Sequence, residues 1–256
     1  MNSKKIFIKD VQINYILVGN GPKKIIFLPG ALGNVFKDFV PQINNLNRNK
    51  YTIIVWDPPG YGLSRPPIRD YSTGFFYRDA DYVLALMKEL NIHKFSLVGW
   101  CHGGVTALIA ASKATDAVQS VVTLGTNAFI TEKDMQIFEE IQNVENWLPE
   151  RRQPFLEIYG ETYFTETWSA WVDAFKIILK ENQGELCSEI LHKIKVPTLI
   201  VHGAKDPLIS IEHALYLKKK ILQGSLNIFP NGKHNIHLKY PDEFNSILDE
   251  FLSTIN

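Results

Sequence analysis

The sequence predicts an α/β fold: a mostly parallel, eight-stranded sheet with helices on both faces and an inserted helical lid. Short apolar runs alternate with helix-like segments, which indicates parallel βαβ units. Several of the strands are apolar along their whole length, as is usual for strands covered by helices on both faces. The alternation stops over residues 127–194. We therefore expect one α/β core from residues 1–126 and 195–256, with residues 127–194 as the lid.

The expected strands are short apolar runs bounded by turn residues, at 6–8, 12–18, 24–28, 51–56, 94–98, 118–124, 196–202 and 225–229. The expected core helices are longer, and either amphipathic or alanine-rich, at 75–90, 105–113, 211–220 and 242–255. Asp242, which follows Pro241, is expected to cap the last helix.

Aromatic side chains recur through the predicted lid. A helical lid needs apolar residues to pack on the sheet, so we expect most of these rings to belong to the core rather than to line a pocket. They are Phe129, Phe138, Trp147, Phe155, Tyr159, Tyr163, Phe164, Trp168, Trp171 and Phe175.

Composition and charge argue against several kinds of partner. Lys plus Arg and Asp plus Glu both number 27, so the net charge is zero and no basic patch predicts nucleic-acid binding. No apolar run approaches the roughly 20 residues of a membrane span, and the first strand begins too early to leave space for a signal peptide. We therefore expect an intracellular, cytoplasmic protein that binds neither nucleic acid nor membranes. Its oligomeric state stays open, with a monomer favoured.

Residues 99–103, Gly-Trp-Cys-His-Gly, have the spacing of a nucleophile elbow, with cysteine in the usual serine position. An apolar strand enters Gly99 and an alanine-rich helix leaves Gly104, as an elbow requires. Such a turn holds its central residue at a strained, usually positive φ and leaves no room for a Cβ at the flanking positions. Cys101 would then lie at a helix N-terminus, which favours a thiolate. The alternative is a glycine-rich turn that serves packing or phosphate binding.

Asp206 and His234 each lie just beyond a later strand, at the sheet edge where open α/β sheets keep their sites. They follow Cys101 in the chain order nucleophile, acid, histidine. Alone, Asp206 would be interpreted as part of a turn and His234 as a surface loop residue; together with the elbow they predict a catalytic triad. His237 is the rival for the base, and we prefer His234 because it directly follows a glycine turn.

Acyl transfer also needs hydrogen-bond donors for the developing oxyanion. We expect two backbone N–H groups to supply them, those of His102 and of Ala31, which lies in a Pro-Gly-Ala-Leu-Gly loop after the third strand. A bare tight turn is the alternative for this loop. Leu32 and His102 are expected to contact the substrate.

With these residues in place, the chain resembles α/β-hydrolases of the valacyclovir hydrolase family, also called biphenyl hydrolase-like proteins. The resemblance runs nearly end to end. It implies the α/β-hydrolase fold and hydrolysis of α-amino acid esters with no metal or cofactor, and it matches Asp206 and His234 to the family's triad. It rests on Leu28-Pro29-Gly30 with Leu32-Gly33, Trp56-Asp57-Pro58, Gly60-Tyr61-Gly62 with Ser64-Arg65-Pro66-Pro67, the elbow, Trp171-Val172-Asp173, Val201-His202-Gly203 with Lys205-Asp206-Pro207, and Gly232-Lys233-His234-Asn235.

Two adjacent positions depart from the family pattern. The family has a nucleophilic serine and then an aspartate that receives the substrate ammonium, whereas this chain has Cys101 and His102. Cysteine hydrolases exist on this fold, and the site resembles that of dienelactone hydrolase, so a Cys-His-Asp triad is chemically sound. Alternatively, His102 points to solvent while a lid acid, Glu157 or Glu161, receives the ammonium.

We therefore expect a hydrolase of small esters, thioesters or lactones that acts through an acyl-enzyme on Cys101, with a small-molecule ester-type substrate and no strong preference for α-amino esters. The alternative is a binding protein or receptor on a hydrolase scaffold, in which a slow or inactive triad holds a ligand under the lid.

Overall fold

The computed structural model describes residues 2–255, and within them eight strands form one sheet in the order β1-β2-β4-β3-β5-β6-β7-β8. The pairs β1·β2 and β2·β4 are antiparallel, and every other pair is parallel. The strands are β1 (Lys4–Ile8), β2 (Val11–Val18), β3 (Lys23–Leu28), β4 (Tyr51–Trp56), β5 (Phe95–Trp100), β6 (Val118–Leu124), β7 (Thr198–Gly203) and β8 (Gly224–Phe229). The predicted fold class is confirmed.

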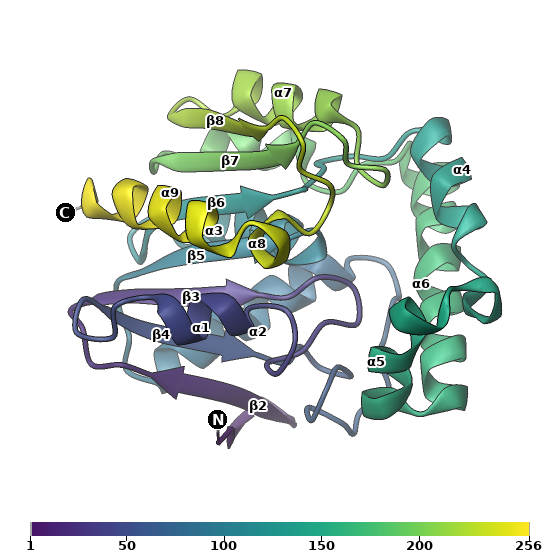
Figure 1. Ribbon diagram of the computed structural model, residues 1–256, viewed down its shortest axis with the longest axis horizontal. Helices are drawn as coiled ribbons and strands as arrows, with labels where there is room; N and C mark the ends of the chain where they lie inside the picture. The colour runs from purple at the N-terminus through teal and green to yellow at the C-terminus, as the bar shows by residue number, and fades with distance from the viewer. Residues whose placement is uncertain (1, 256) are drawn as a thin grey trace.

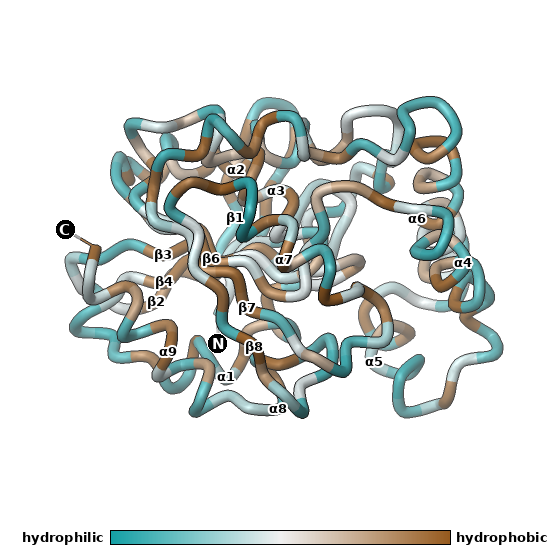
Figure 2. The backbone as a smooth tube through the Cα atoms, turned by 90° about the horizontal axis from the view of Figure 1, so that it is seen from above, coloured by the Kyte–Doolittle hydropathy of each residue, from teal (hydrophilic) through white to brown (hydrophobic). Residues whose placement is uncertain are grey.

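Helices cover both faces of the sheet, as the apolar strands predict. One face carries α2 (Phe75–Glu89), α3 (His102–Lys113) and α7 (Ile211–Lys220), and the other carries α1 (Val40–Asn45) and α9 (Pro241–Ser253). Figure 1 shows α1 and α9 crossing the near side of the sheet, and Figure 2 shows the apolar central strands between the two helix layers.

Each face has its own buried core because successive side chains of a strand point to opposite faces. In β3, Ile26 and Leu28 join the core cluster under α2 and α3, whereas Ile25 and Phe27 join the cluster under α1 and α9. The sheet is thereby fixed from both sides, and the loops at the ends of its strands are held in place.

Residues 127–194, which we call the helical insertion, contain α4 (Glu132–Glu140), α5 (Pro149–Tyr159) and α6 (Glu161–Asn182), with 3-10 turns η1 (Val144–Asn146) and η2 (Ser188–Lys193). Among the described residues of this segment, the β-structure is one isolated bridge between Phe129 and Glu185. Figure 1 shows the parallel strands pointing toward α4, α5 and α6, which places the insertion at the carboxyl edge of the sheet.

The predicted cap of the last helix is wrong. Helix α9 begins at Pro241 with Tyr240 as its N-cap, so Asp242 lies in the first helical turn and caps nothing. Proline is favoured at the first helical position, because the N–H that it lacks would have no partner there. The short helices α1 and α8 (Ile236–Lys239) were not predicted, since they are too short to show a helical period.

Within residues 2–255, every helix falls short of the length or the apolar character that a membrane crossing demands.

Candidate active site

The turn between β5 and α3 has the geometry of a nucleophile elbow. Cys101 has φ 53° and ψ −115°, and its side chain is partly exposed. A Cβ at Gly99 would lie 2.2 Å from the carbonyl oxygen of Gly103, and a Cβ at Gly103 would lie 2.0 Å from that of Leu28. Both contacts are with backbone atoms, so no side chain fits at either position and both glycines are required.

The imidazole of His234 is held by a carboxylate that is itself fixed. His234 Nδ1 donates to Asp206 Oδ2 at 2.8 Å. The other oxygen, Oδ1, accepts the backbone N–H groups of Leu208 at 2.9 Å and Ile209 at 3.1 Å. The Asp206 side chain is 1% exposed. Because Nδ1 is committed to Asp206, His234 offers Nε2 for proton transfer with Cys101.

Charge at the site favours a protonated His234. Burial alone would lower its pKa, but the interactions with Cys101 and Asp206 outweigh burial and raise the pKa of His234 to about 10. Burial also opposes ionisation of Asp206, yet His234 and the two backbone donors hold the pKa of that carboxyl below its usual range. The three side chains therefore form one electrostatically coupled group.

His237 lies elsewhere, although it is only three residues from His234. Its side chain is fully buried, and Nε2 donates to the backbone oxygen of Asp38 at 2.8 Å. Burial lowers the pKa of His237 to about 3, against the smaller effect of that hydrogen bond. The structure thus pairs His234, and not His237, with the acid.

The two expected oxyanion donors face no protein acceptor. The N–H groups of Ala31 and His102 donate to no other group among the described residues, and both residues line the cavity described below. A hydrogen bond from Gly30 N to Asp38 Oδ2, at 3.0 Å, holds the loop that carries Ala31.

Leu32 does not have the position expected of a substrate-binding residue. It is fully buried, has a φ of 49°, and packs in the core cluster that also contains α2 and α3. Its side chain is not among the groups that line the cavity. The left-handed backbone of this loop turns Leu32 inward, which residue type alone could not reveal.

His102 is buried rather than pointing to solvent, with 7% of its surface exposed. Trp171 Nε1 donates to His102 Nε2 at 2.6 Å, and the rings of Phe76 and Phe175 lie 5.0 and 5.5 Å from its ring. Burial lowers the pKa of His102 well below its usual value, and the positive charge of Arg69 acts in the same direction. His102 is therefore neutral.

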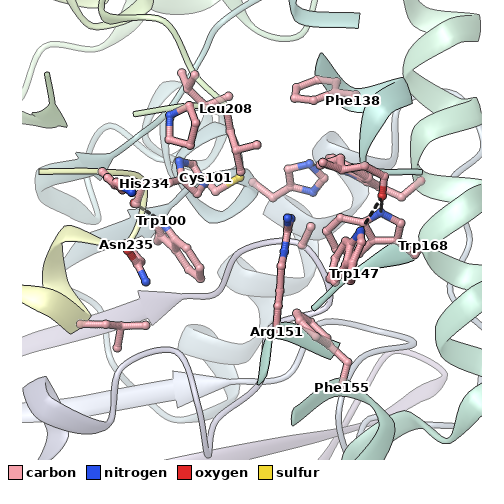
Figure 3. Close-up of a pocket in the computed structure, with 18 of the residues that line it drawn as sticks. Trp100, Cys101, Phe138, Trp147, Arg151, Phe155, Trp168, Leu208, His234 and Asn235 are labelled. Atoms are coloured by element: carbon pink, nitrogen blue, oxygen red, sulfur yellow. Dashed lines mark hydrogen bonds between the residues drawn. The ribbon is translucent and has the colours of Figure 1, made fainter. Parts of the chain in front are cut away.

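A cavity of about 410 Å³ lies between the strand-end loops and the helical insertion (Figure 3). Cys101 and His234 line it, whereas Glu157 and Glu161 do not. All ten aromatics of the insertion lie in or against the buried core, as expected, and six of the ten also line the cavity. These are Phe138, Trp147, Phe155, Trp168, Trp171 and Phe175. Core packing and cavity lining are compatible, since their rings also pack on one another.

Two further residues position His234, and sequence reasoning missed them. Trp100 Nε1 donates to the backbone oxygen of His234 at 2.9 Å. A Cβ at Gly125, whose φ is 52°, would lie 2.9 Å from His234 Nδ1 and 3.2 Å from Asp206 Oδ2. Trp100 ends the elbow strand β5, and Gly125 directly follows the neighbouring strand β6. Their place at the carboxyl edge of the sheet is the signal that could have identified them.

In the part of the chain that the structure describes, no group of three or more His, Cys, Asp or Glu side chains is arranged to hold a metal ion.

Comparisons with known proteins identify the family of the chain. A family model described as alpha/beta hydrolase fold matches residues 23–170. The chain is 42% identical to human "Serine hydrolase BPHL" over 98% of its own length and 87% of that protein. It is 23% identical to "3-oxoadipate enol-lactonase 2" of Acinetobacter baylyi, over 97% of this chain and 96% of that protein.

Among solved structures, a meta-cleavage product hydrolase from Pseudomonas fluorescens IP01 superposes with a TM-score of 0.83 at 22% identity. The match covers 99% of this chain and 98% of the hydrolase. At this identity the likeness shows the fold alone.

Proposed function

The chain belongs to the α/β-hydrolase family, close to serine hydrolase BPHL, and from this premise we propose that it hydrolyses small carboxylic esters, thioesters or lactones through an acyl-enzyme on Cys101. The observation that carries the proposal is the coupled group of Cys101, His234 and Asp206 at the wall of the cavity between the strand-end loops and the helical insertion. The helical insertion would act as the lid. The name of the enol-lactonase relative supports including lactones.

In the first half of the reaction, Cys101 gives its proton to His234 and the thiolate attacks the carbonyl carbon of the substrate. The carbonyl electron pair moves to oxygen, and the N–H groups of Ala31 and His102 stabilise the oxyanion. When the carbonyl reforms, the bond to the leaving oxygen or sulfur breaks. His234 Nε2 returns its proton to the leaving group, and the acyl group stays on Cys101 as a thioester.

In the second half, His234 removes a proton from water as the water oxygen attacks the thioester carbonyl. The carbon–sulfur bond then breaks, which releases a carboxylic acid and returns the thiolate to Cys101. Asp206 keeps Nδ1 of His234 occupied throughout, so Nε2 is the atom that carries the proton in both halves.

Two features bear on the substrate. The aromatic lining and the volume of about 410 Å³ suit a small, largely apolar acyl or alcohol group. The residue beside the nucleophile is a neutral imidazole instead of a carboxylate, so the site offers no charge there to hold an α-ammonium group. We therefore extend the proposal to uncharged as well as α-amino esters.

The test is turnover of 4-nitrophenyl acetate, a phenyl thioester and a simple lactone by the unmodified protein, the Cys101→Ala variant and a Cys187→Ala control. Cys187 is buried and does not line the cavity. We expect turnover by the unmodified protein and the control, and a loss of at least about a thousandfold in Cys101→Ala. Absence of turnover for all three substrates would reject the proposal in favour of a ligand-binding protein.

A further inference from the structure

The charged groups that line the cavity are mostly cationic. Its lining includes three basic residues, Lys37, Arg151 and Lys233, and one acidic residue, Glu150. Glu150 makes no ion pair with these cations in the described structure. An apolar cavity that keeps unpaired cations in its wall is suited to a ligand with a negative charge.

Lys37 reaches from the loop after β3 to the helical insertion. Its Nζ lies 3.4 Å from the ring centroid of Phe155 on α5, and it has no carboxylate partner within ion-pair distance in residues 2–255. Burial lowers the pKa of Lys37; the charge of Asp38 opposes this effect, and that of Arg151 adds to it. The two cations therefore lie near enough to repel each other, and within residues 2–255 neither forms an ion pair with an acid.

Arg151 lies one helical turn before Phe155 on α5, so both project from the same side of that helix. Its guanidinium lies 3.8 Å from the ring centroid of Trp147. Figure 3 shows the Arg151 side chain extending into the cavity toward Cys101. The neighbouring Arg152 differs, because it forms an ion pair with Glu161 and does not line the cavity.

From this arrangement we propose that the cavity binds substrates that carry a carboxylate, seated by Lys37 and Arg151 on the side of the cavity that α5 forms. The inference rests on the proposed ester hydrolysis and narrows its substrate class to esters with a second, ionised acid group. A guanidinium matches the two oxygens of a carboxylate, and an ammonium adds a point charge that needs no fixed direction. The neutral His102 beside Cys101 adds no competing negative charge.

Three 4-nitrophenyl esters of similar length test the proposal: the hydrogen adipate, the methyl adipate and the 6-aminohexanoate. We expect kcat/KM to be at least about tenfold higher for the anionic ester than for the neutral one, and lowest for the cationic one. Lys37→Gln and Arg151→Gln should each remove most of this preference, measured as the ratio of kcat/KM for the anionic ester to that for the neutral ester in the same variant. Arg152→Gln is the matched control and should keep the preference for the anionic ester. Added salt should weaken the preference, because the charges are partly exposed.

Equal rates for the anionic and neutral esters, or a preference that survives in the Lys37→Gln/Arg151→Gln double variant, would overturn the inference and leave ester hydrolysis intact. If no ester is turned over, the proposed hydrolysis is wrong, and a binding experiment then tests the carboxylate site separately. Calorimetry on the Cys101→Ala protein should then give tighter binding of monomethyl adipate than of dimethyl adipate. This difference in affinity should disappear when Lys37→Gln and Arg151→Gln are added to Cys101→Ala. Equal binding of the two ligands would overturn the site.

Discussion

Trp171, on α6 of the helical insertion, donates its indole N–H to Nε2 of His102, the residue that follows Cys101, at 2.6 Å. An indole N–H can only donate, so Nε2 of His102 carries no proton, and the neutral ring holds its proton on Nδ1. If Nε2 of His102 were also protonated, it and the indole N–H of Trp171 would be two donors facing each other without an acceptor. The position next to Cys101 is therefore kept uncharged, and this hydrogen bond also fastens the insertion to the elbow.

An uncharged His102 predicts little selectivity for α-amino esters. The ratio of kcat/KM for valine benzyl ester to that for the benzyl ester of 3-methylbutanoic acid should stay within about threefold of one. His102→Asp should raise it roughly tenfold to a hundredfold, since a carboxylate would pair with the ammonium.

His102→Asn is the control for this experiment, because asparagine has the size of aspartate without its charge. Its ratio should match that of the unmodified protein. A strong amino-ester preference in the unmodified protein would show that another group receives the ammonium.

Cys101→Ser tests whether Asp206 and His234 form a working general base. A thiol ionises near pH 8.5 and needs little help, whereas a serine hydroxyl must be deprotonated during attack. We expect Cys101→Ser to retain measurable esterase activity that disappears when His234→Ala is added. A folded but inactive serine variant would indicate that the base does not reach the nucleophile.

Alkylation should distinguish the two cysteines. Cys101 is partly exposed at a helix N-terminus and beside His234, whereas burial raises the pKa of the Cys187 thiol. Iodoacetamide at pH 6.5 should therefore modify Cys101 much faster than Cys187, as measured by peptide mass spectrometry. Equal rates for both residues would contradict an activated thiol.

Buried His237 predicts a loss of stability in acid. Its pKa is about 3 in the folded protein and about 6.5 in an unfolded chain, so between these values only the unfolded state takes up a proton. The free energy of unfolding should fall by up to about 1.4 kcal/mol per pH unit as the pH drops from about 6.5 toward 3. Denaturant titrations of His237→Gln, which keeps a donor for the Asp38 carbonyl, should show a shallower fall. The same slope in both proteins would exclude His237 as its source.

The strands of the sheet, the tight turn at Cys101 and the pairing of His234 with Asp206 could be predicted from the sequence. Each expected strand appears within two residues of its predicted ends, because apolar periodicity and turn residues are local signals. Gly99 and Gly103 could be assigned their steric role for the same reason: the requirement arises within one strand-turn-helix unit.

What the sequence could not show depends on contacts between distant segments. Trp171 meets His102, and Lys37 meets Phe155, only when the helical insertion closes over the sheet edge. The inward turn of Leu32 depends on a positive φ at a residue that is not glycine, which is uncommon and has no sequence pattern.

The central claim is that Cys101 carries the acyl group, and trapping that intermediate tests it most directly. After rapid mixing with 4-nitrophenyl acetate and an acid quench, peptide mass spectrometry should find one acetyl group on Cys101. It should accumulate further in His234→Ala, because release of the acyl group needs the base more than thiol attack does. It should be absent in Cys101→Ala. Two results would contradict the account. One is an acetyl group found only on residues other than Cys101, and the other is no acetyl group on the His234→Ala variant while that variant still consumes the ester.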